Sequence, residues 1–131
     1  MRIAVTCGGT GGHVFPGVAA ALAMRAKGHE VALVLSGRSV EGEAPSGWDG
    51  AMIRLAIPRL SLHRPASLFS MARACFVAVA ALRRFRPAVL LAMGSYTSVP
   101  PVLAARWLLI PVVLHEANAI PGRAVSMLSR M

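Results

Sequence analysis

Short, continuously apolar segments alternate with longer segments of helical periodicity, and this alternation constrains the fold more than any other feature. The apolar segments cover residues 3–6, 30–35, 51–57, 88–93 and 111–114. Helical spacing predicts helices over 15–26, 67–85 and 97–108 and a last helix from Pro121. Strands that alternate with helices form parallel sheets, and strands apolar on both faces are covered by helices on both sides. We therefore expect an α/β protein with a Rossmann-like, doubly wound parallel sheet of order 3-2-1-4-5.

Composition sets the size and class of the protein. With 131 residues, 56% of them hydrophobic, the chain suits one packed domain and is not a disordered protein. Cys7 and Cys75 lie far apart in apolar surroundings, which excludes a disulfide scaffold and indicates a reducing compartment. We recognise no signal peptide and no clean transmembrane helix, because arginines flank the run 75–82 and Pro111 breaks the run 107–114. The chain is therefore expected to be cytoplasmic.

The net charge of +9 predicts attraction to phosphates, nucleic acid or anionic lipid without choosing among them. The predicted helix 67–85 carries apolar side chains and a cluster of arginines near its end, and a basic connector over 58–65 precedes it. Such a helix can dock on an anionic membrane surface, or it can be a core helix with solvated arginines at its ends.

Polar residues are scarce, and they collect where three of the predicted strands end. These loops are Gly8 to His13 after the first strand, Gly94 to Ser98 after the fourth, and His115 to Asn118 after the fifth. In an open parallel sheet, ligands bind beyond the carboxyl ends of the strands, where the strand order reverses. We therefore expect the three loops to form one site.

The first loop suits a phosphate group. Its glycines let the backbone approach a ligand closely, and the start of the following helix offers free N–H groups. The dinucleotide fingerprint fails because Val14 occupies its third glycine position, and no Lys-Ser/Thr pair completes a Walker A loop. His13, at the entry to the helix, either acts as a general base or caps or hydrogen-bonds the loop.

The other two loops leave similar alternatives. In the second, Thr97 or Ser98 can cap the next helix, with Pro100 and Pro101 in its first turn, or face the site. In the third, a histidine, Glu116 and Asn118 bind either a ligand or one another, because burying them unpaired is costly. The histidines have no metal-ligand spacing and no carboxylate pair accompanies them, so we expect no metal site. We also expect no cofactor.

Taken together, the three loops resemble the N-terminal domain of the MurG glycosyltransferase family. The matching segments are GGTGGHVFPG over 8–17, GSYTS before a proline at 94–98, and HEANAIPG over 115–122, and the resemblance runs in register along essentially the whole chain. It implies one half of a GT-B glycosyltransferase: residues 1–131 are the acceptor-side, membrane-associating domain, and the donor-binding C-terminal domain is absent. The chain departs from the family at Ser95, where glycine is usual, and at Ala88, Ala92 and Ala117.

The resemblance also implies an activity. The family transfers N-acetylglucosamine from UDP-N-acetylglucosamine to the muramic acid C4 hydroxyl of lipid I, forming the lipid II of peptidoglycan. It inverts the anomeric centre without a metal, and it works as a peripheral protein on the cytoplasmic face of the bacterial inner membrane, with no nucleic-acid partner. This chain alone is expected to be inactive.

By position, the resemblance implies roles for single residues. His13 becomes the candidate base, with Glu116 in possible support. The candidate substrate-binding residues are Thr10, Gly11, Gly12, Gly94, Ser95, Tyr96, Ser98 and Asn118.

Two other functions remain open. The chain could be a non-catalytic partner that anchors a split glycosyltransferase at the membrane, as the basic apolar helix suggests. It could also be a generic nucleotide-binding module recruited by charge, which the failed nucleotide motifs disfavour.

Overall fold

The structure, a computed structural model, describes residues 1–37, 47–57 and 65–131. Its elements in chain order are β1 (Arg2–Thr6), α1 (Gly11–Ala26), β2 (Glu30–Leu35), β3 (Ala51–Arg54), α3 (Pro65–Phe85), β4 (Val89–Ala92), the 3₁₀ turn η1 (Tyr96–Ser98), α4 (Val99–Trp107), β5 (Val112–Leu114) and α5 (Arg123–Leu128). The five strands form one parallel sheet of order β3-β2-β1-β4-β5, which confirms the predicted topology.

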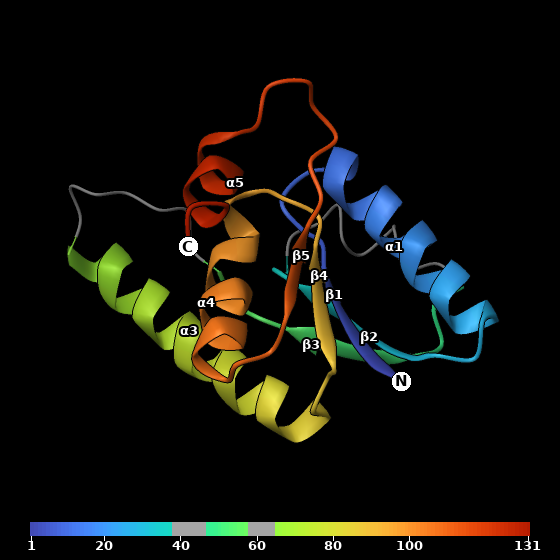
Figure 1. The fold of residues 1–131 in the computed structure, drawn as a ribbon. Coiled ribbons are helices and arrows are strands. Elements are labelled where there is room, and N and C mark those ends of the chain that lie inside the picture. Colours follow the sequence, from blue (N-terminus) through green and yellow to red (C-terminus); the bar gives the residue numbers. More distant parts are fainter. Residues whose placement is uncertain (38–46, 58–64) are drawn as a thin grey trace.

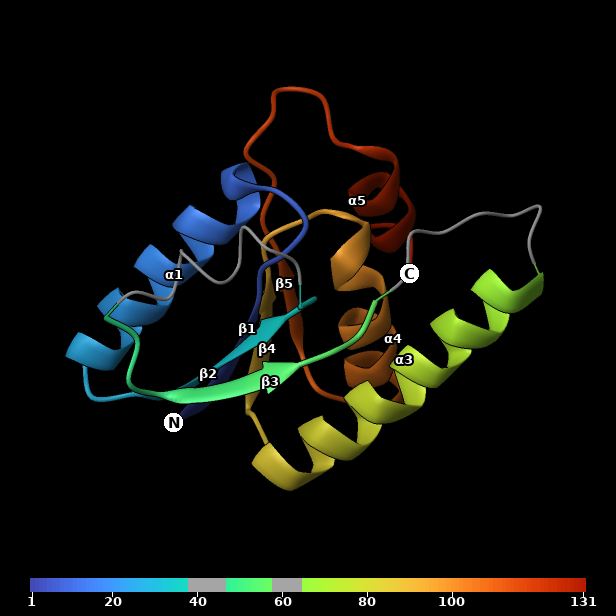
Figure 2. The ribbon, with the colours of Figure 1, turned by 180° about the vertical axis from the view of Figure 1, so that it is seen from behind.

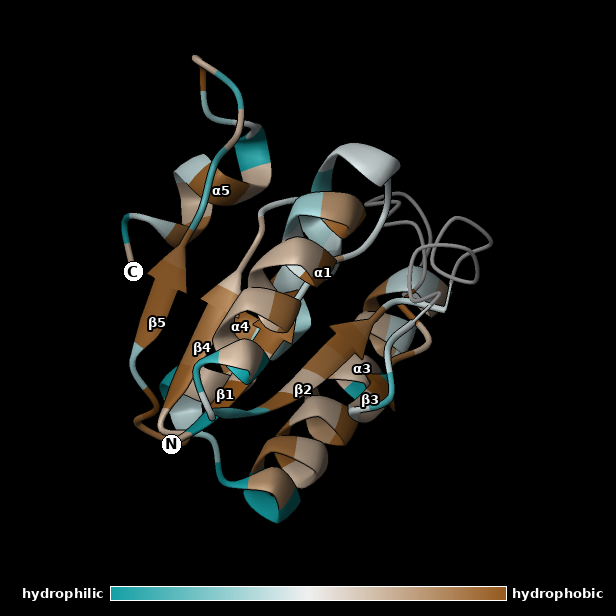
Figure 3. Cartoon of the chain, turned by 90° about the vertical axis from the view of Figure 1, so that its right-hand side faces the viewer, coloured by the Kyte–Doolittle hydropathy of each residue, from teal (hydrophilic) through white to brown (hydrophobic). Residues whose placement is uncertain are grey.

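The sheet lies between two layers of helices. Helix α1 covers one face and α3 and α4 cover the other, while α5 lies beside α4 (Figures 1 and 2). Alternate residues of the central strands enter different cores: Val5 and Leu33 pack with the α1 side, whereas Ala4 and Leu90 pack with the α3 side. Because both faces are buried, the strands are hydrophobic along their length (Figure 3).

Several elements begin or end where the sequence pattern did not place them. Helix α1 begins at Gly11, not at residue 15, so the glycine-rich segment is partly its first turn. Strand β3 ends at Arg54, although Leu55 and Ile57 beyond it remain buried. The apolar pattern follows burial, and burial continues past the last residue of the strand. Residues 58–64 of the basic connector and residues 38–46 of the predicted loop 36–50 lie outside the described residues.

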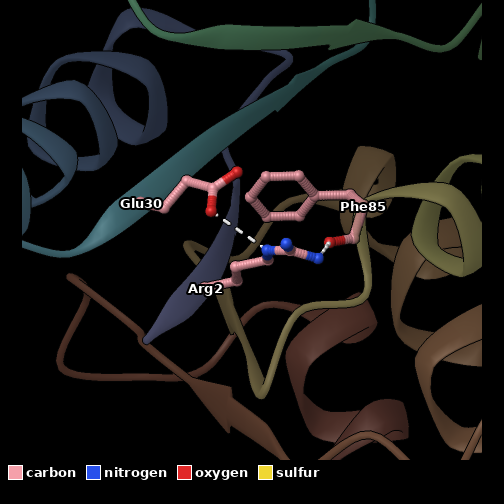
Figure 4. A network of polar contacts seen from close by, with 3 residues as sticks. All are labelled: Arg2, Glu30 and Phe85. Carbon is pink, nitrogen blue, oxygen red and sulfur yellow. Dashed lines mark hydrogen bonds and ion pairs between the residues drawn. The ribbon is translucent and has the colours of Figure 1, made fainter.

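A polar network ties three elements together at the amino edge of the sheet. Arg2, at the start of β1, donates from Nε to the Glu30 carboxylate at 3.0 Å and from a terminal nitrogen to the Phe85 carbonyl at 3.2 Å (Figure 4). The network joins β1, the start of β2 and the end of α3. It lies opposite the edge where the polar loops collect.

Helix α3 is strongly apolar, although most of its length is not buried. Within the part of the chain that the structure describes, Ala66–Phe85 is long and apolar enough to cross a membrane by length and composition, with a mean hydropathy of 1.5 and 22% of that window buried. The sequence reading recognised no such helix. A helix packed into a core passes the same test, and α3 does pack on α4 through residues such as Ala78 and Leu82.

Candidate functional site

The three polar loops meet at the carboxyl edge of the sheet, as the topology predicts. A Cβ atom placed on Gly94 would lie 3.4 Å from His13 Cε1 and 3.4 Å from the His115 carbonyl oxygen. A Cβ atom on Gly9 would lie 2.6 Å from Ser95 Oγ. The second loop therefore lies close to both the first and the third, and the approach of Ser95 to Gly9 depends on the absence of a side chain at that glycine.

His13 lies in the first turn of α1, half-buried, with its ring held by a distant backbone group. Its Nδ1 is 2.7 Å from the carbonyl oxygen of Met93, at the end of β4. A carbonyl only accepts hydrogen bonds, so Nδ1 carries the proton in the neutral ring and Nε2 keeps its lone pair. This tautomer suits a general base acting through Nε2. Sequence reasoning missed Met93, because a backbone carbonyl leaves no side-chain signal.

The N-terminus of α1 offers uncapped donors. Thr10 is the N-cap residue in an extended conformation, yet its side chain makes no capping hydrogen bond. Gly11 and Gly12 are the first two residues of α1, so their backbone N–H groups have no hydrogen-bond partner within the helix. Unsatisfied N–H groups and the positive end of the helix dipole favour an anion at this position.

The second loop places its hydroxyl groups differently from the prediction. Ser98 is the N-cap residue of α4 but makes no side-chain cap; it is completely buried, and its hydroxyl donates to the Gly94 carbonyl at 2.5 Å. Thr97 is also buried, at 2% exposure. Tyr96 packs against the α3-side core. Ser98 is therefore the N-cap residue, as one of the two alternatives predicts, but its buried hydroxyl closes the loop on Gly94 and does not cap the helix. Pro100 does lie in the first turn of α4, as expected.

The third loop is organised around one carboxylate. Glu116 accepts from the Asn118 backbone N–H at 3.0 Å, the Asn118 side-chain amide at 2.7 Å and the Gly122 N–H at 3.0 Å. These donors, Gly122 first, lower the pKa of Glu116 from its ordinary value, with a smaller contribution from the nearby His13. Of the two alternatives for this loop, pairing within the loop is therefore what the structure shows.

The remaining acids of the described residues lie elsewhere. Glu30 pairs with Arg2, and Asp49 pairs with Arg25, which also lies over the Trp48 ring. Among residues 1–37, 47–57 and 65–131, no group of three histidine, cysteine or acidic side chains is placed to hold a metal ion. The chemistry that this site can offer from its own residues is the His13 imidazole, with Nε2 not engaged by the Met93 carbonyl, beside backbone N–H donors at the start of α1.

A parallel sheet with a glycine-rich turn before a helix, and with polar loops gathered where the strand order reverses, defines a Rossmann-like ligand-binding domain. Comparison with known proteins narrows this class to one family. Residues 3–131 match the model of the glycosyltransferase family 28 N-terminal domain, and the chain belongs to this family.

Curated relatives agree along the same residues. An enzyme of Methylobacterium sp. (strain 4-46), named UDP-N-acetylglucosamine–N-acetylmuramyl-(pentapeptide) pyrophosphoryl-undecaprenol N-acetylglucosamine transferase, is 42% identical over 98% of this chain. An enzyme of the same name from Halorhodospira halophila is 41% identical over 98% of the chain. The chain spans only 35% and 37% of the length of these two relatives.

Solved structures lead to the same family. The crystal structure of Acinetobacter baumannii MurG has a TM-score of 0.89 and 29% identity, and the match covers 98% of this chain and 39% of that one. The Streptomyces sp. SF2575 glycosyltransferase SsfS6, at 23% identity and a TM-score of 0.65, shares the fold. The resemblance to the MurG family and the Rossmann-like half of a GT-B glycosyltransferase are thereby confirmed.

Proposed function

We propose that this chain is the acceptor-side domain of an N-acetylglucosaminyltransferase that converts lipid I to lipid II. The donor is UDP-N-acetylglucosamine, and the acceptor is the undecaprenyl-diphosphate-linked muramyl pentapeptide. The observation that carries the proposal is the meeting of three loops at one sheet edge, in a chain 42% identical to a transferase so named. The donor-binding domain corresponds to the part of the relatives that this chain does not cover.

In the proposed reaction, the C4 hydroxyl oxygen of the acceptor sugar attacks the anomeric carbon of the donor. The bond from that carbon to the diphosphate oxygen breaks, UDP leaves, and the attack from the opposite side inverts the anomeric centre. Nε2 of His13 takes the hydroxyl proton, while the Met93 carbonyl keeps the ring in the required tautomer. The charge that develops on the leaving group is offset by fixed dipoles and needs no metal in this proposal.

The substrate-binding loops have distinct roles. The N–H groups of Gly11 and Gly12, with the Thr10 side chain beside them, face a diphosphate at the start of α1. Gly94 and Ser95 form the opposite wall for the acceptor. In the third loop, Glu116 holds the Asn118 amide, which leaves the amide oxygen to contact the sugar. Tyr96 and Ser98 support the second loop from inside the protein.

The acceptor is membrane-linked, and α3 supplies a surface that suits a membrane. Phe69 and Phe76 are 75% and 68% exposed, and Trp107 of α4 is 73% exposed. Phe76, Trp107 and Arg83 line a mostly apolar hollow of about 260 Å³. Apolar side chains next to arginines are typical of peripheral proteins on anionic membranes. We place the domain at the cytoplasmic face of the plasma membrane.

The proposed function is tested by supplying the missing part from a relative. A chimaera joins residues 1–131 to the remaining length of the Methylobacterium enzyme, and its turnover is measured with UDP-N-acetylglucosamine and a short-chain lipid I analogue. We expect transfer to lipid I and none to a lipid acceptor that lacks the muramyl sugar. A folded chimaera that gives no lipid II, beside an active parent enzyme, would contradict the proposal. Vesicle binding without transfer would favour the anchoring partner instead.

A further inference from the structure

Three residues other than glycine have a positive φ among the described residues, and they fall into two groups. Arg86, with φ 53°, and Leu109, with φ 57°, follow the ends of α3 and α4 at the amino edge of the sheet. There a left-handed residue is a common way to end a helix. Ser95, with φ 70° and ψ 155°, lies in a region of backbone space that is essentially restricted to glycine. Of these three described residues with positive φ, Ser95 is the one that lies at the candidate site.

Ser95 also lies against Gly9 of the first glycine-rich loop. Its hydroxyl oxygen lies 2.6 Å and its Cβ 3.6 Å from the position that a Cβ of Gly9 would take. Gly9 itself has a φ of 92° and comes just before Thr10, the N-cap of α1. The serine side chain therefore fills the space left by the missing side chain of Gly9, and the loops cannot approach more closely while it is present.

The neighbours of Ser95 hold it in this conformation. On one side is Gly94, where an added Cβ would lie 3.4 Å from His13 Cε1 and from the His115 carbonyl oxygen. On the other, the Ser98 N–H donates to the Ser95 carbonyl at 3.1 Å, and the Ser98 hydroxyl closes back on Gly94 at 2.5 Å. An unfavourable backbone conformation persists only where the surrounding structure fixes it, and such residues gather at ligand sites.

We propose that Ser95 is a positioning residue that sets the separation of the first and second loops for the diphosphate of the acceptor. This inference rests on the proposed function. If the separation of the two loops is already fixed, the ligand does not have to order them when it binds. The entropic cost of binding is then smaller, and the affinity is higher than for a mobile loop. Glycine at this position would relax the backbone, remove the spacer and leave the loop to be ordered by the ligand.

The test compares Ser95→Gly and Ser95→Ala in the chimaera. Ser95→Gly should raise the thermal unfolding midpoint, because the unfavourable conformation is relieved, and should raise the acceptor KM about three- to tenfold, with a smaller change in kcat. Ser95→Ala keeps the backbone conformation but loses the spacer, so its acceptor KM should rise without a rise in midpoint. The donor KM should stay unchanged in both variants.

Leu109→Gly is the matched control, since it relieves a positive φ at the opposite edge of the sheet. It should leave the acceptor KM at the wild-type value whatever its effect on the midpoint. A Ser95→Gly variant with a raised midpoint and an unchanged acceptor KM would overturn the inference.

Binding of inorganic pyrophosphate to the 131-residue chain, measured by calorimetry, separates this inference from the proposed function. We expect weaker binding by Ser95→Gly than by the wild type. If the wild-type chimaera makes no lipid II, the proposed function fails, and equal pyrophosphate affinity of the two chains would still overturn the role of Ser95.

Discussion

At the scale of single residues, the site depends on side chains fixed by backbone groups. The Met93 carbonyl determines which nitrogen of His13 carries the proton, and the Gly122 and Asn118 N–H groups hold the Glu116 carboxylate. Groups fixed in this way need little reorganisation when charge moves during a reaction. The contributions of His13 and Glu116 can be separated by mutation. The position of His13 affects the proposed proton transfer, whereas the Glu116 carboxylate affects the shape of the third loop.

Replacing His13 with alanine in the chimaera removes the proposed base. We expect kcat to fall by roughly 10²- to 10⁴-fold, the usual contribution of a positioned base, with a much smaller change in acceptor KM. Steady-state kinetics at saturating donor checks this. His29→Ala is the control, because His29 lies between α1 and β2, at the amino edge. Near-normal turnover by the His13 variant would remove it as the base.

Glu116→Gln should change the pH dependence of stability. The pKa of Glu116 is lowered in the folded chain from its ordinary value of 4.5, so the carboxylate stabilises the fold above that pH and loses this contribution as the pH falls through the folded pKa. Glutamine does not titrate in this range. The difference in unfolding free energy between the two chains should therefore be largest near neutral pH and disappear in strong acid.

Urea unfolding of both chains across the acid range measures this difference. A difference that is the same at every pH would mean that the loop does not depend on the charge of Glu116.

At the scale of elements, the contact of α1 with the sheet depends on one glycine. A Cβ on Gly17 would lie 2.4 Å from Cys7 Cβ and 3.1 Å from Met93 Cγ, so the helix can lie this close to β1 and β4 only without a side chain there. The same approach brings His13, one turn earlier, to the Met93 carbonyl. Helix packing and the position of the candidate base are therefore linked.

Gly17→Ala should destabilise the chain by about 1–3 kcal/mol, because the added methyl group meets buried atoms and not a flexible side-chain end. Gly12→Ala is the control in the same helix. Its Cβ would find its nearest neighbour, Thr10 Oγ1, at 3.9 Å, so no crowding is expected there. Denaturant unfolding of the two variants checks this prediction, and equal midpoints would contradict it.

At the scale of the whole molecule, the helix layer that contains α3 exposes apolar and basic side chains to solvent. The face of α3 that is turned to solvent carries Phe69 and Phe76 together with arginines, in a chain of net charge +9. The membrane surface proposed above is thus part of the same helix layer that packs on the sheet.

A Phe69→Ser/Phe76→Ser double variant should bind anionic vesicles at least tenfold more weakly than the wild-type chain, since each exposed phenylalanine that enters the lipid contributes about 1.5–3 kcal/mol. Vesicle sedimentation at low and physiological salt measures this, and added salt should weaken the binding further. Phe15→Ser, on α1, is the control, with a side chain 57% exposed in the other helix layer. Equal loss in both variants would argue against a specific membrane surface.

The strand order and the edge that carries the site could be predicted from the sequence, because apolar runs and helical periods are local properties that constrain parallel topology. The three loops could be found for the same reason. The tautomer of His13, the inward turn of the Ser98 hydroxyl and the pairing around Glu116 depended on the fold. Met93 lies 80 residues from His13 in sequence, and the backbone of Ser95 is fixed by contacts with other loops, so only the tertiary structure decided them.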